Sequence, residues 1–171
     1  MADVYLGIGS NMGDRQANIH RAIQYLQEHE DIQVVAVSSM IETDPEEACL
    51  PDRQGLPQEK FLNGALHIKT DLLPLDLLSQ LKMIERRLGR QKSAPNSPRP
   101  MDLDILFYDD VVIRGGKTLS IPHPRLDKRA FVLRPLLEIA PALSHPRSQK
   151  TVRELLDSLT DEPRPSTRSL A

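Results

Sequence analysis

Residues 99–106 of this chain read Arg-Pro-Met-Asp-Leu-Asp-Ile-Leu. An apolar run that contains two carboxylates predicts a strand from Met101 to Tyr108. Because side chains two positions apart point to the same face of a strand, Asp102 and Asp104 are expected roughly 6.5 to 7 Å apart on one face. Two like charges held together favour a shared cation, and oxygen ligands at this spacing suit Mg²⁺. A strand end with two solvated aspartates is the simpler alternative.

Outward from this strand, the spacing of apolar residues predicts further strands and helices. Strands are expected over residues 4–8, 32–41 and 61–70, and helices over 17–30, 74–88, 131–139 and 152–159. In the clearest helix, over 74–88, the predicted apolar stripe consists of Leu75, Leu78, Leu81, Ile84 and Leu88. Two proline-rich loops, 42–60 and 90–100, separate these elements. Strands and helices mixed in this way predict an α+β fold around a mainly antiparallel sheet.

The length and composition indicate one globular domain. The chain has 171 residues, of which 39% are hydrophobic and 27% charged, and we expect a domain over 1–160 and a disordered tail over 161–171. A net charge of −2 argues against a nucleic-acid or membrane partner. The single cysteine, Cys49, excludes an internal disulfide framework and fits a reducing compartment. The N-terminal residues show neither a signal peptide nor a membrane span, so we predict a cytoplasmic protein. We separately expect it to be a monomer.

A glycine-rich segment over residues 7–13 reads Gly-Ile-Gly-Ser-Asn-Met-Gly. It lacks the lysine of a Gly-x-x-x-x-Gly-Lys-Ser/Thr phosphate loop, and its third glycine stands one residue too late for Gly-x-Gly-x-x-Gly. We therefore interpret the segment as a tight turn between a strand and a helix.

Basic residues gather directly upstream of the two aspartates. The segment over residues 82–99 contains one acidic residue, Glu85, and six basic ones: Lys82, Arg86, Arg87, Arg90, Lys92 and Arg99. The last three lie in or beside a predicted loop, where they can reach a polyphosphate. His123, between two prolines, is either a structural turn or a second nucleotide contact. Carboxylates for Mg²⁺ beside mobile cations are the components of phosphoryl-type transfer.

Five blocks of the sequence occur in the order typical of one enzyme family. They cover residues 5–14, 61–65, 84–90, 98–106 and 121–136. The chain resembles the 6-hydroxymethyl-7,8-dihydropterin pyrophosphokinase family over residues 4–141. The resemblance implies a three-layer α/β/α sandwich with a ferredoxin-like core. It also implies ATP-dependent transfer of pyrophosphate to the hydroxymethyl group of 6-hydroxymethyl-7,8-dihydropterin, with release of AMP, in folate biosynthesis.

The resemblance further implies roles for individual residues. Asp102 and Asp104 would hold two Mg²⁺ ions, and with Arg90 and Arg99 they would form the catalytic group. Contacts to ATP, with Glu85 near the ribose and the basic residues on the phosphates, are implied for Glu85, Lys92, Arg99, Ile105, Ser120, His123 and Arg129. Contacts to the pterin, with Asn63 as hydrogen-bond partner and two phenylalanines stacked on the ring, are implied for Thr43, Pro45, Phe61, Asn63, Asp102 and Phe131.

The chain departs from the family pattern in its loops. Asn96 stands where many members have Trp, Ser97 stands where Gly or Ala is usual, and the loop over 42–60 is longer and acidic. Two alternatives stay open. One is another Mg²⁺-dependent nucleotide hydrolase or transferase that uses the same aspartates, and the other is a binding module that holds ATP or a pterin without turnover. A nucleic-acid module is the weakest alternative, because the basic segment lacks interleaved aromatic residues.

Overall fold

A computed structural model describes residues 1–44, 58–92 and 97–161 of the chain. Its strands are β1 (Ala2–Ser10), β2 (Ile32–Val37), β3 (Ile41–Thr43), β4 (Phe61–Thr70) and β5 (Asp102–Tyr108). Its helices are α1 (Arg15–Gln27), α2 (Pro74–Arg87), α3 (Ala130–Ile139) and α4 (Val152–Asp161), with a short 3₁₀ turn at Leu126–Lys128. Within these ranges, no helix is long and apolar enough to cross a membrane.

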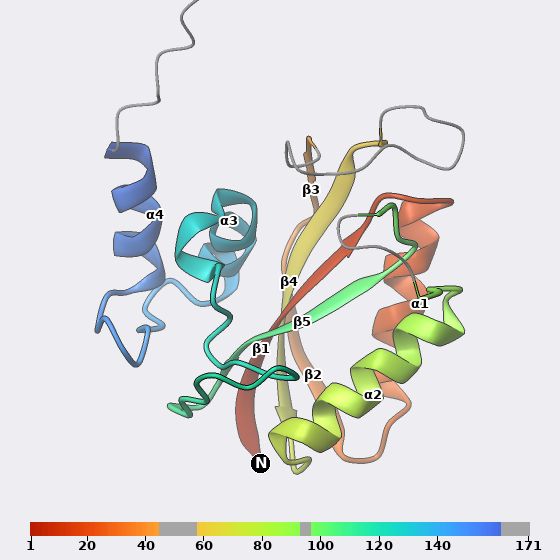
Figure 1. The fold of residues 1–171 in the computed structure, drawn as a ribbon, viewed down its shortest axis with the longest axis horizontal. Coiled ribbons are helices and arrows are strands. Elements are labelled where there is room, and N and C mark those ends of the chain that lie inside the picture. The colour runs from red at the N-terminus through yellow and green to blue at the C-terminus, as the bar shows by residue number, and fades with distance from the viewer. Residues whose placement is uncertain (45–57, 93–96, 162–171) are drawn as a thin grey trace, which may run out of the picture.

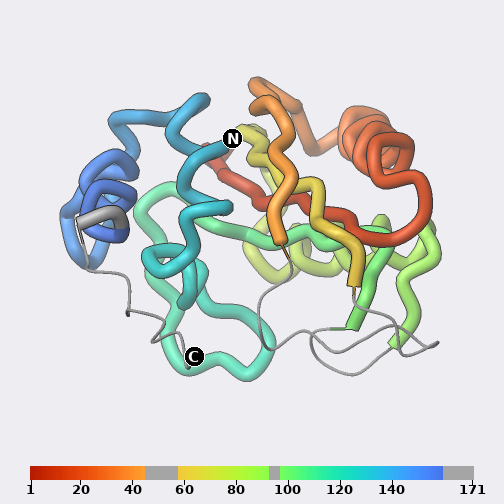
Figure 2. Tube along the Cα trace, turned by 90° about the horizontal axis from the view of Figure 1, so that it is seen from above, coloured from red at the N-terminus to blue at the C-terminus, as the bar shows by residue number. Residues whose placement is uncertain are grey.

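The strands form one antiparallel sheet in the order β2-β4-β1-β5, and β3 pairs with the first residues of β4. This strand order, with the chain order β1-α1-β2-β4-α2-β5, is the ferredoxin-like arrangement. Figure 1 shows α1 and α2 on one face of the sheet and α3 on the other. In Figure 2, turned by 90°, α4 again lies beyond α3, far from α1. The predicted α+β class and three-layer sandwich are confirmed.

Each face of the sheet has its own apolar core, because strand side chains alternate between the two faces. On the side of α1 and α2, Val4, Leu6 and Ile8 of β1 are buried. On the side of α3, Phe107 of β5 packs in a cluster with Leu133 of α3. The sheet is therefore held between two separate, mainly aliphatic clusters.

A β-bulge in β5 changes the direction of the side chains along this strand. Tyr5 of β1 pairs with Phe107, but the next residue, Leu6, pairs with Ile105, so Leu106 is an extra residue. Leu106 and Phe107 consequently both belong to the core on the α3 side.

The predicted strand over 32–41 is two strands in the structure. β2 ends at Val37 and β3 begins at Ile41, because the three residues between them lie opposite only two residues of β4. Ser38 pairs with Ala65 of β4 in this connection. Its amide donates to the Ala65 carbonyl at 2.9 Å, and its hydroxyl accepts from the Ala65 amide at 2.8 Å. The sequence showed one β-branched run and gave no sign of the extra residue.

Two helices have different ends from those predicted. Asp14 caps α1 by accepting the Ala17 amide at 3.0 Å, so this helix begins at Arg15, and it ends at Gln27 rather than near residue 30. α4 continues to Asp161, so the first residue of the predicted tail is helical. The rest of that tail lies outside the described residues.

The buried face of α2 differs from the predicted stripe. Leu77, Leu81 and Ile84 are buried, in the i, i+4, i+7 spacing of one helix face. Leu75, which the prediction placed in the stripe, is 59% exposed. The prediction is wrong for Leu75 because a spacing of three residues drifts away from the 3.6-residue period of the helix.

This orientation of α2 predicts unequal effects of one substitution at two positions. Leu81→Ala should lower the free energy of unfolding by about 2 to 5 kcal/mol, because it removes a fully buried side chain and leaves a cavity. Leu75→Ala, the matched control, should change it by no more than about 0.5 kcal/mol. Urea unfolding followed by circular dichroism measures both values. Equal destabilisation by the two variants would contradict the orientation described for α2.

Candidate active site

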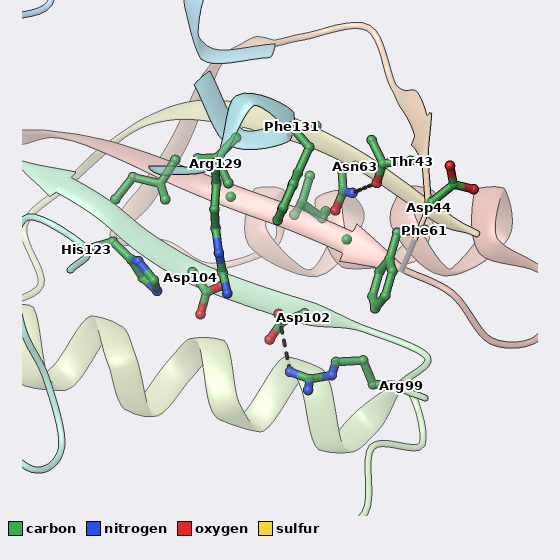
Figure 3. Close-up of a pocket in the computed structure, with 16 residues that line it drawn as sticks. Thr43, Asp44, Phe61, Asn63, Arg99, Asp102, Asp104, His123, Arg129 and Phe131 are labelled. Atoms are coloured by element: carbon green, nitrogen blue, oxygen red, sulfur yellow. Dashed lines mark hydrogen bonds and ion pairs between the residues drawn. The ribbon is translucent and has the colours of Figure 1, made fainter. Parts of the chain in front are cut away.

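An open pocket lies on the α3 side of the sheet, where β1, β4 and β5 meet β3 and the start of α3. The side chains that Figure 3 labels around it are Thr43, Asp44, Phe61, Asn63, Arg99, Asp102, Asp104, His123, Arg129 and Phe131. The lining is completed by Gly7, Ile8, Gly9, Gly64, Leu106 and Val132. The pocket thus joins segments that are far apart in the sequence.

The register of β1 with its two neighbours aligns the two ends of the pocket. Gly9 pairs with Asn63 of β4 on one side and with Asp102 of β5 on the other, and Gly7 pairs with Asp104. Directly paired residues of antiparallel strands project to the same face. Neighbouring strands are about 4.8 Å apart, so the backbones at Asn63 and Asp102 are about 10 Å apart across Gly9.

The two aspartates point into the pocket from the same face of β5, as the sequence predicts. Leu103 and Ile105 point the other way, into the core under α1 and α2. Burial, followed by the negative charge of Asp102, raises the pKa of Asp104 to about 7. The ionised form of Asp104 is therefore unfavourable in the protein alone, and a cation beside it would stabilise that form.

Two arginines pair with Asp102. Arg90 Nη1 lies 2.8 Å from Asp102 Oδ1, and Arg99 Nη1 lies 3.4 Å from Asp102 Oδ2. Arg99 lines the pocket. Arg90 is not among the lining residues and reaches Asp102 from the C-terminal end of α2. Asp102 is therefore held by two positive charges, one from the end of α2 and one from the segment before β5.

Glu85 links α2 to the acidic strand and is only 1% exposed. Its carboxylate accepts the Leu103 amide at 2.8 Å and pairs with Lys82 Nζ at 3.1 Å and with Arg90 Nη1 at 2.7 Å. An amide and two cations satisfy a buried carboxylate well. These contacts fix β5 between its two aspartates. Glu85 is not among the lining residues, so its contact with an ATP ribose stays a prediction.

His123 and Arg129 lie beside the aspartates, and Figure 3 shows Arg129 extending toward Asp104. The His123 amide donates to the Leu106 carbonyl at 3.0 Å, which anchors the imidazole to β5. His123 Nδ1 accepts the Arg125 amide at 3.2 Å, so Nε2 carries the proton of the neutral ring. Burial and then the charge of Arg129 lower the pKa of His123. A neutral N–H donor and a guanidinium therefore lie at the acidic end of the pocket.

The other end of the pocket is largely apolar and carries one amide. Phe61 of β4 and Phe131 of α3 line it, on either side of Asn63 in the view of Figure 3. Asn63 Nδ2 donates to Thr43 Oγ1 at 2.7 Å, which fixes the amide plane. A Cβ on Gly9 would lie 2.6 Å from Asn63 Oδ1, so the amide requires a glycine opposite it. Two rings and an oriented amide suit a flat heteroaromatic ligand with a mixed donor and acceptor edge.

The interpretation of residues 7–13 as a turn is correct only for residues 11–13, which follow the end of β1. Gly13 has a φ of +71°, which glycine adopts easily, and lies in the turn before α1. Gly7 and Gly9 lie within β1 and line the pocket, so the turn interpretation is wrong for them. Glycines at alternate positions of a strand leave one face without side chains, and this spacing was the signal available in the sequence.

For four further predicted site residues, the structure shows no side chain in the pocket lining or does not describe the residue. Lys92 and Ser120 are not among the residues that line it. The Ile105 side chain is buried in the core, which leaves only its backbone for a ligand. Pro45 lies outside the described residues. The proposed contacts of these four residues stay predictions.

The pocket also contains residues that the sequence analysis missed. Leu106 stands two positions after Asp104, so the alternation that aligned the aspartates already placed it on their face. Val132 follows Phe131 at the start of α3. Asp44, next to Thr43, carried no signal in the sequence.

The two aspartates fit Mg²⁺ better than a metal held entirely by protein. In the part of the chain that the structure describes, no group of three or more His, Cys, Asp or Glu side chains is arranged to hold a metal ion. Mg²⁺ commonly takes one or two carboxylates from the protein and completes its shell with water and phosphate oxygens. The oxygen donors of Asp102 and Asp104 therefore fit a cation that arrives with a polyphosphate.

Comparisons with known proteins agree on one family. A profile described as 7,8-dihydro-6-hydroxymethylpterin-pyrophosphokinase (HPPK) matches residues 5–141. The chain is 43% identical over 163 residues to the 2-amino-4-hydroxy-6-hydroxymethyldihydropteridine pyrophosphokinase of Aquifex aeolicus, with 95% of this chain and 96% of that protein covered. It is 39% identical over 158 residues to the protein of the same name from Bacillus subtilis, with 92% and 85% covered.

A solved structure shares the fold at lower identity. The Plasmodium falciparum HPPK-DHPS wild type, in a structure with pterin and p-hydroxybenzoate, superposes with a TM-score of 0.70 at 19% identity. The match covers 92% of this chain and 43% of that chain, so this chain spans less than half of it.

The residues that form the sheet and the pocket fall within the matched range, apart from the first residues of β1. The relatives from Aquifex aeolicus and Bacillus subtilis are matched over most of their length. The family prediction drawn from the motifs is confirmed: the chain belongs to the 7,8-dihydro-6-hydroxymethylpterin-pyrophosphokinase family.

Proposed function

We propose that the pocket carries out the reaction for which the family is named. It transfers pyrophosphate from ATP to the hydroxymethyl group of 6-hydroxymethyl-7,8-dihydropterin, releasing AMP, in folate biosynthesis. One observation carries the proposal. On one side of Gly9 the pocket has an amide between two aromatic rings, and on the other side it has two aspartates on one strand face. The first part suits a pterin, and the second suits a polyphosphate with divalent cations. The proposal takes the chain to act as a monomer in the cytoplasm.

Asp102 and Asp104 would hold two Mg²⁺ ions in this reaction. Bound there, the metal would offset the negative charge of the phosphates and of the attacking and leaving oxygens. The raised pKa of about 7 favours the protonated form of Asp104, so Asp104 must lose its proton before it can bind a metal ion. Asp102 must exchange its arginine contacts for the metal. Both requirements favour a cation that is delivered together with a polyphosphate.

Arg99, Arg129 and His123 would bind the phosphates of ATP, because all three line the acidic end and present N–H donors. Arg90 would become available to the phosphates once Asp102 binds a cation, and its second contact, to buried Glu85, would keep it nearby. Guanidinium groups placed in advance stabilise the charge that develops on a transferring phosphoryl group. Phe61, Asn63 and Phe131 would hold the pterin ring, with its hydroxymethyl group directed toward Asp102.

One incubation tests the proposal against its two alternatives. The protein is mixed with ATP, MgCl₂ and 6-hydroxymethyl-7,8-dihydropterin, and the products are identified by mass. The proposal requires AMP together with a pterin that has gained one pyrophosphoryl group. ADP in place of AMP would indicate another nucleotide hydrolase or transferase. Binding of both ligands without product, even in a single turnover, would indicate a binding module.

The raised pKa of Asp104 predicts a pH-dependent gain in stability for Asp104→Asn. The unfolded protein releases this proton near pH 4 and the folded protein near pH 7, so the free energy of unfolding of the wild type falls between these values. Asparagine does not titrate. In the presence of a chelator, the stability advantage of Asp104→Asn should be small at pH 4, grow up to pH 7 and stay constant above it, as measured by thermal unfolding.

The same variant should lose more than about tenfold in turnover, a change of about 1.4 kcal/mol or more in activation free energy. Asp110→Asn is the matched control, because Asp110 is an exposed aspartate just beyond β5. It should change neither the pH profile of stability nor the rate. A stability difference for Asp104→Asn that does not vary with pH would contradict the environment assigned to this carboxyl group.

The amide end of the pocket predicts a selective loss of pterin binding. Asn63→Leu should weaken pterin binding by about 1 to 3 kcal/mol, the usual effect of leaving a buried polar group of the ligand unpaired. The affinity for ATP should stay nearly unchanged, because Asn63 lies across Gly9 from the aspartates. Calorimetric titration with each ligand measures both values. Equal loss of both affinities would mean that Asn63 is structural.

Two glycine variants in β1 test the same end of the pocket without a substitution of Asn63 itself. Gly9→Ala places a methyl group 2.6 Å from Asn63 Oδ1, so the amide must move and pterin affinity should fall. Gly7→Ala is the matched control, because its methyl group would meet Leu106 at an ordinary distance of 3.5 Å. Similar pterin affinities for the two variants would contradict the close approach of Gly9 and Asn63.

A further inference from the structure

Asn11 is a buried residue that connects the acidic end of the pocket to its amide end through hydrogen bonds. It follows β1 directly and is only 2% exposed. Asn11 does not line the pocket. Its backbone and side chain nevertheless make hydrogen bonds to two segments that carry pocket residues, one before β5 and one before β4. A buried amide with this many partners is well placed to hold segments together.

The first connection runs to the backbone of Arg99. The Asn11 amide donates to the Arg99 carbonyl at 3.2 Å, and the Arg99 amide donates to Asn11 Oδ1 at 2.9 Å. These bonds fix the main chain of Arg99, whose guanidinium lies 3.4 Å from Asp102. Asn11 therefore determines where this arginine enters the acidic end of the pocket.

The second connection runs to the residues that lead into β4. Asn11 Nδ2 donates to Gln58 Oε1 at 2.6 Å and to the Glu59 carbonyl at 3.4 Å. Two residues later, Phe61 begins β4 and lines the amide end of the pocket. The side chain of Asn11 thus uses its acceptor for the arginine segment and its donor group for the segment before Phe61. A carboxamide offers a donor group and an acceptor at the end of one short side chain.

We propose that Asn11 is a positioning residue that couples nucleotide binding to pterin binding. This inference rests on the proposed function, in which Arg99 contacts the phosphates and Phe61 and Asn63 hold the pterin. A nucleotide that binds the Arg99 guanidinium stabilises the main-chain position that Asn11 holds, and through its bonds to Gln58 and Glu59 Asn11 extends that stabilisation to the segment before β4. Reciprocity of binding free energies then requires that the pterin tighten nucleotide binding by the same factor.

The test measures this coupling factor. Pterin is titrated into the protein with and without MgCl₂ and a non-hydrolysable ATP analogue, and the ratio of the two dissociation constants is the factor. In the wild type we expect a factor in the range of about 5 to 150. In Asn11→Ala the factor should fall toward one. A residue with a merely structural role would lower both affinities and leave their ratio unchanged.

Two further variants sharpen the test. Asn11→Asp keeps the acceptor for the Arg99 amide but loses the donor to Gln58 and Glu59, so it should lose the coupling while its nucleotide affinity stays closer to wild type. It also carries the test if Asn11→Ala does not fold, as thermal unfolding will reveal. Asn18→Ala is the matched control, because Asn18 Nδ2 donates to the Met12 carbonyl at 3.0 Å in the neighbouring turn. It should keep the wild-type factor.

The outcomes separate this inference from the proposed function. A wild type that binds neither ligand would overturn the proposed function, and the inference with it. A wild type that binds both ligands with a factor of one would overturn the inference alone. The inference is also overturned if Asn11→Ala or Asn11→Asp folds and retains the wild-type factor.

Discussion

The pairing of β1 with both β4 and β5 is the constraint on which the rest of the site depends. Burial of Val4, Leu6 and Ile8 against α1 and α2 determines which face of this strand meets the core. The opposite face then presents Gly7 and Gly9 to the pocket. A shift of one residue would exchange the two faces, which the apolar residues strongly oppose. The same burial that stabilises the fold therefore sets the separation between the amide and the aspartates.

Ion pairs between charged side chains then stabilise the acidic end of the pocket. Two aspartates on one face repel each other, and burial adds to the unfavourable energy of their charges. Around Asp102 this repulsion is offset by Arg90 and Arg99, and Glu85 holds Arg90 from inside the core. Asp104 instead responds with a raised pKa. The pocket is thus organised around a charge imbalance, which the proposed divalent cation would relieve.

The sequence pattern correctly predicted the features that depend only on neighbouring residues. β4 has the predicted bounds of 61–70, and the two aspartates share a face, because alternation along a strand is a property of neighbouring residues. The break at Ser38 depends on pairing with a distant strand, and the burial of Glu85 depends on contacts between α2 and β5. Gly9 was misread because a glycine in a turn and a glycine opposite a bulky partner look alike in a sequence. The contacts of the site residues with ATP and the pterin stay predictions.

The absence of a side chain at Gly9 has a consequence for inheritance as well as for geometry. Every single-base change in a glycine codon that specifies another amino acid introduces at least a Cβ. At Gly9 that atom would meet the Asn63 oxygen at 2.6 Å, whichever amino acid carries it. The genetic code therefore offers this position no missense neighbour that leaves the amide in place. Missense variants at this codon should be selected against even where the protein still folds.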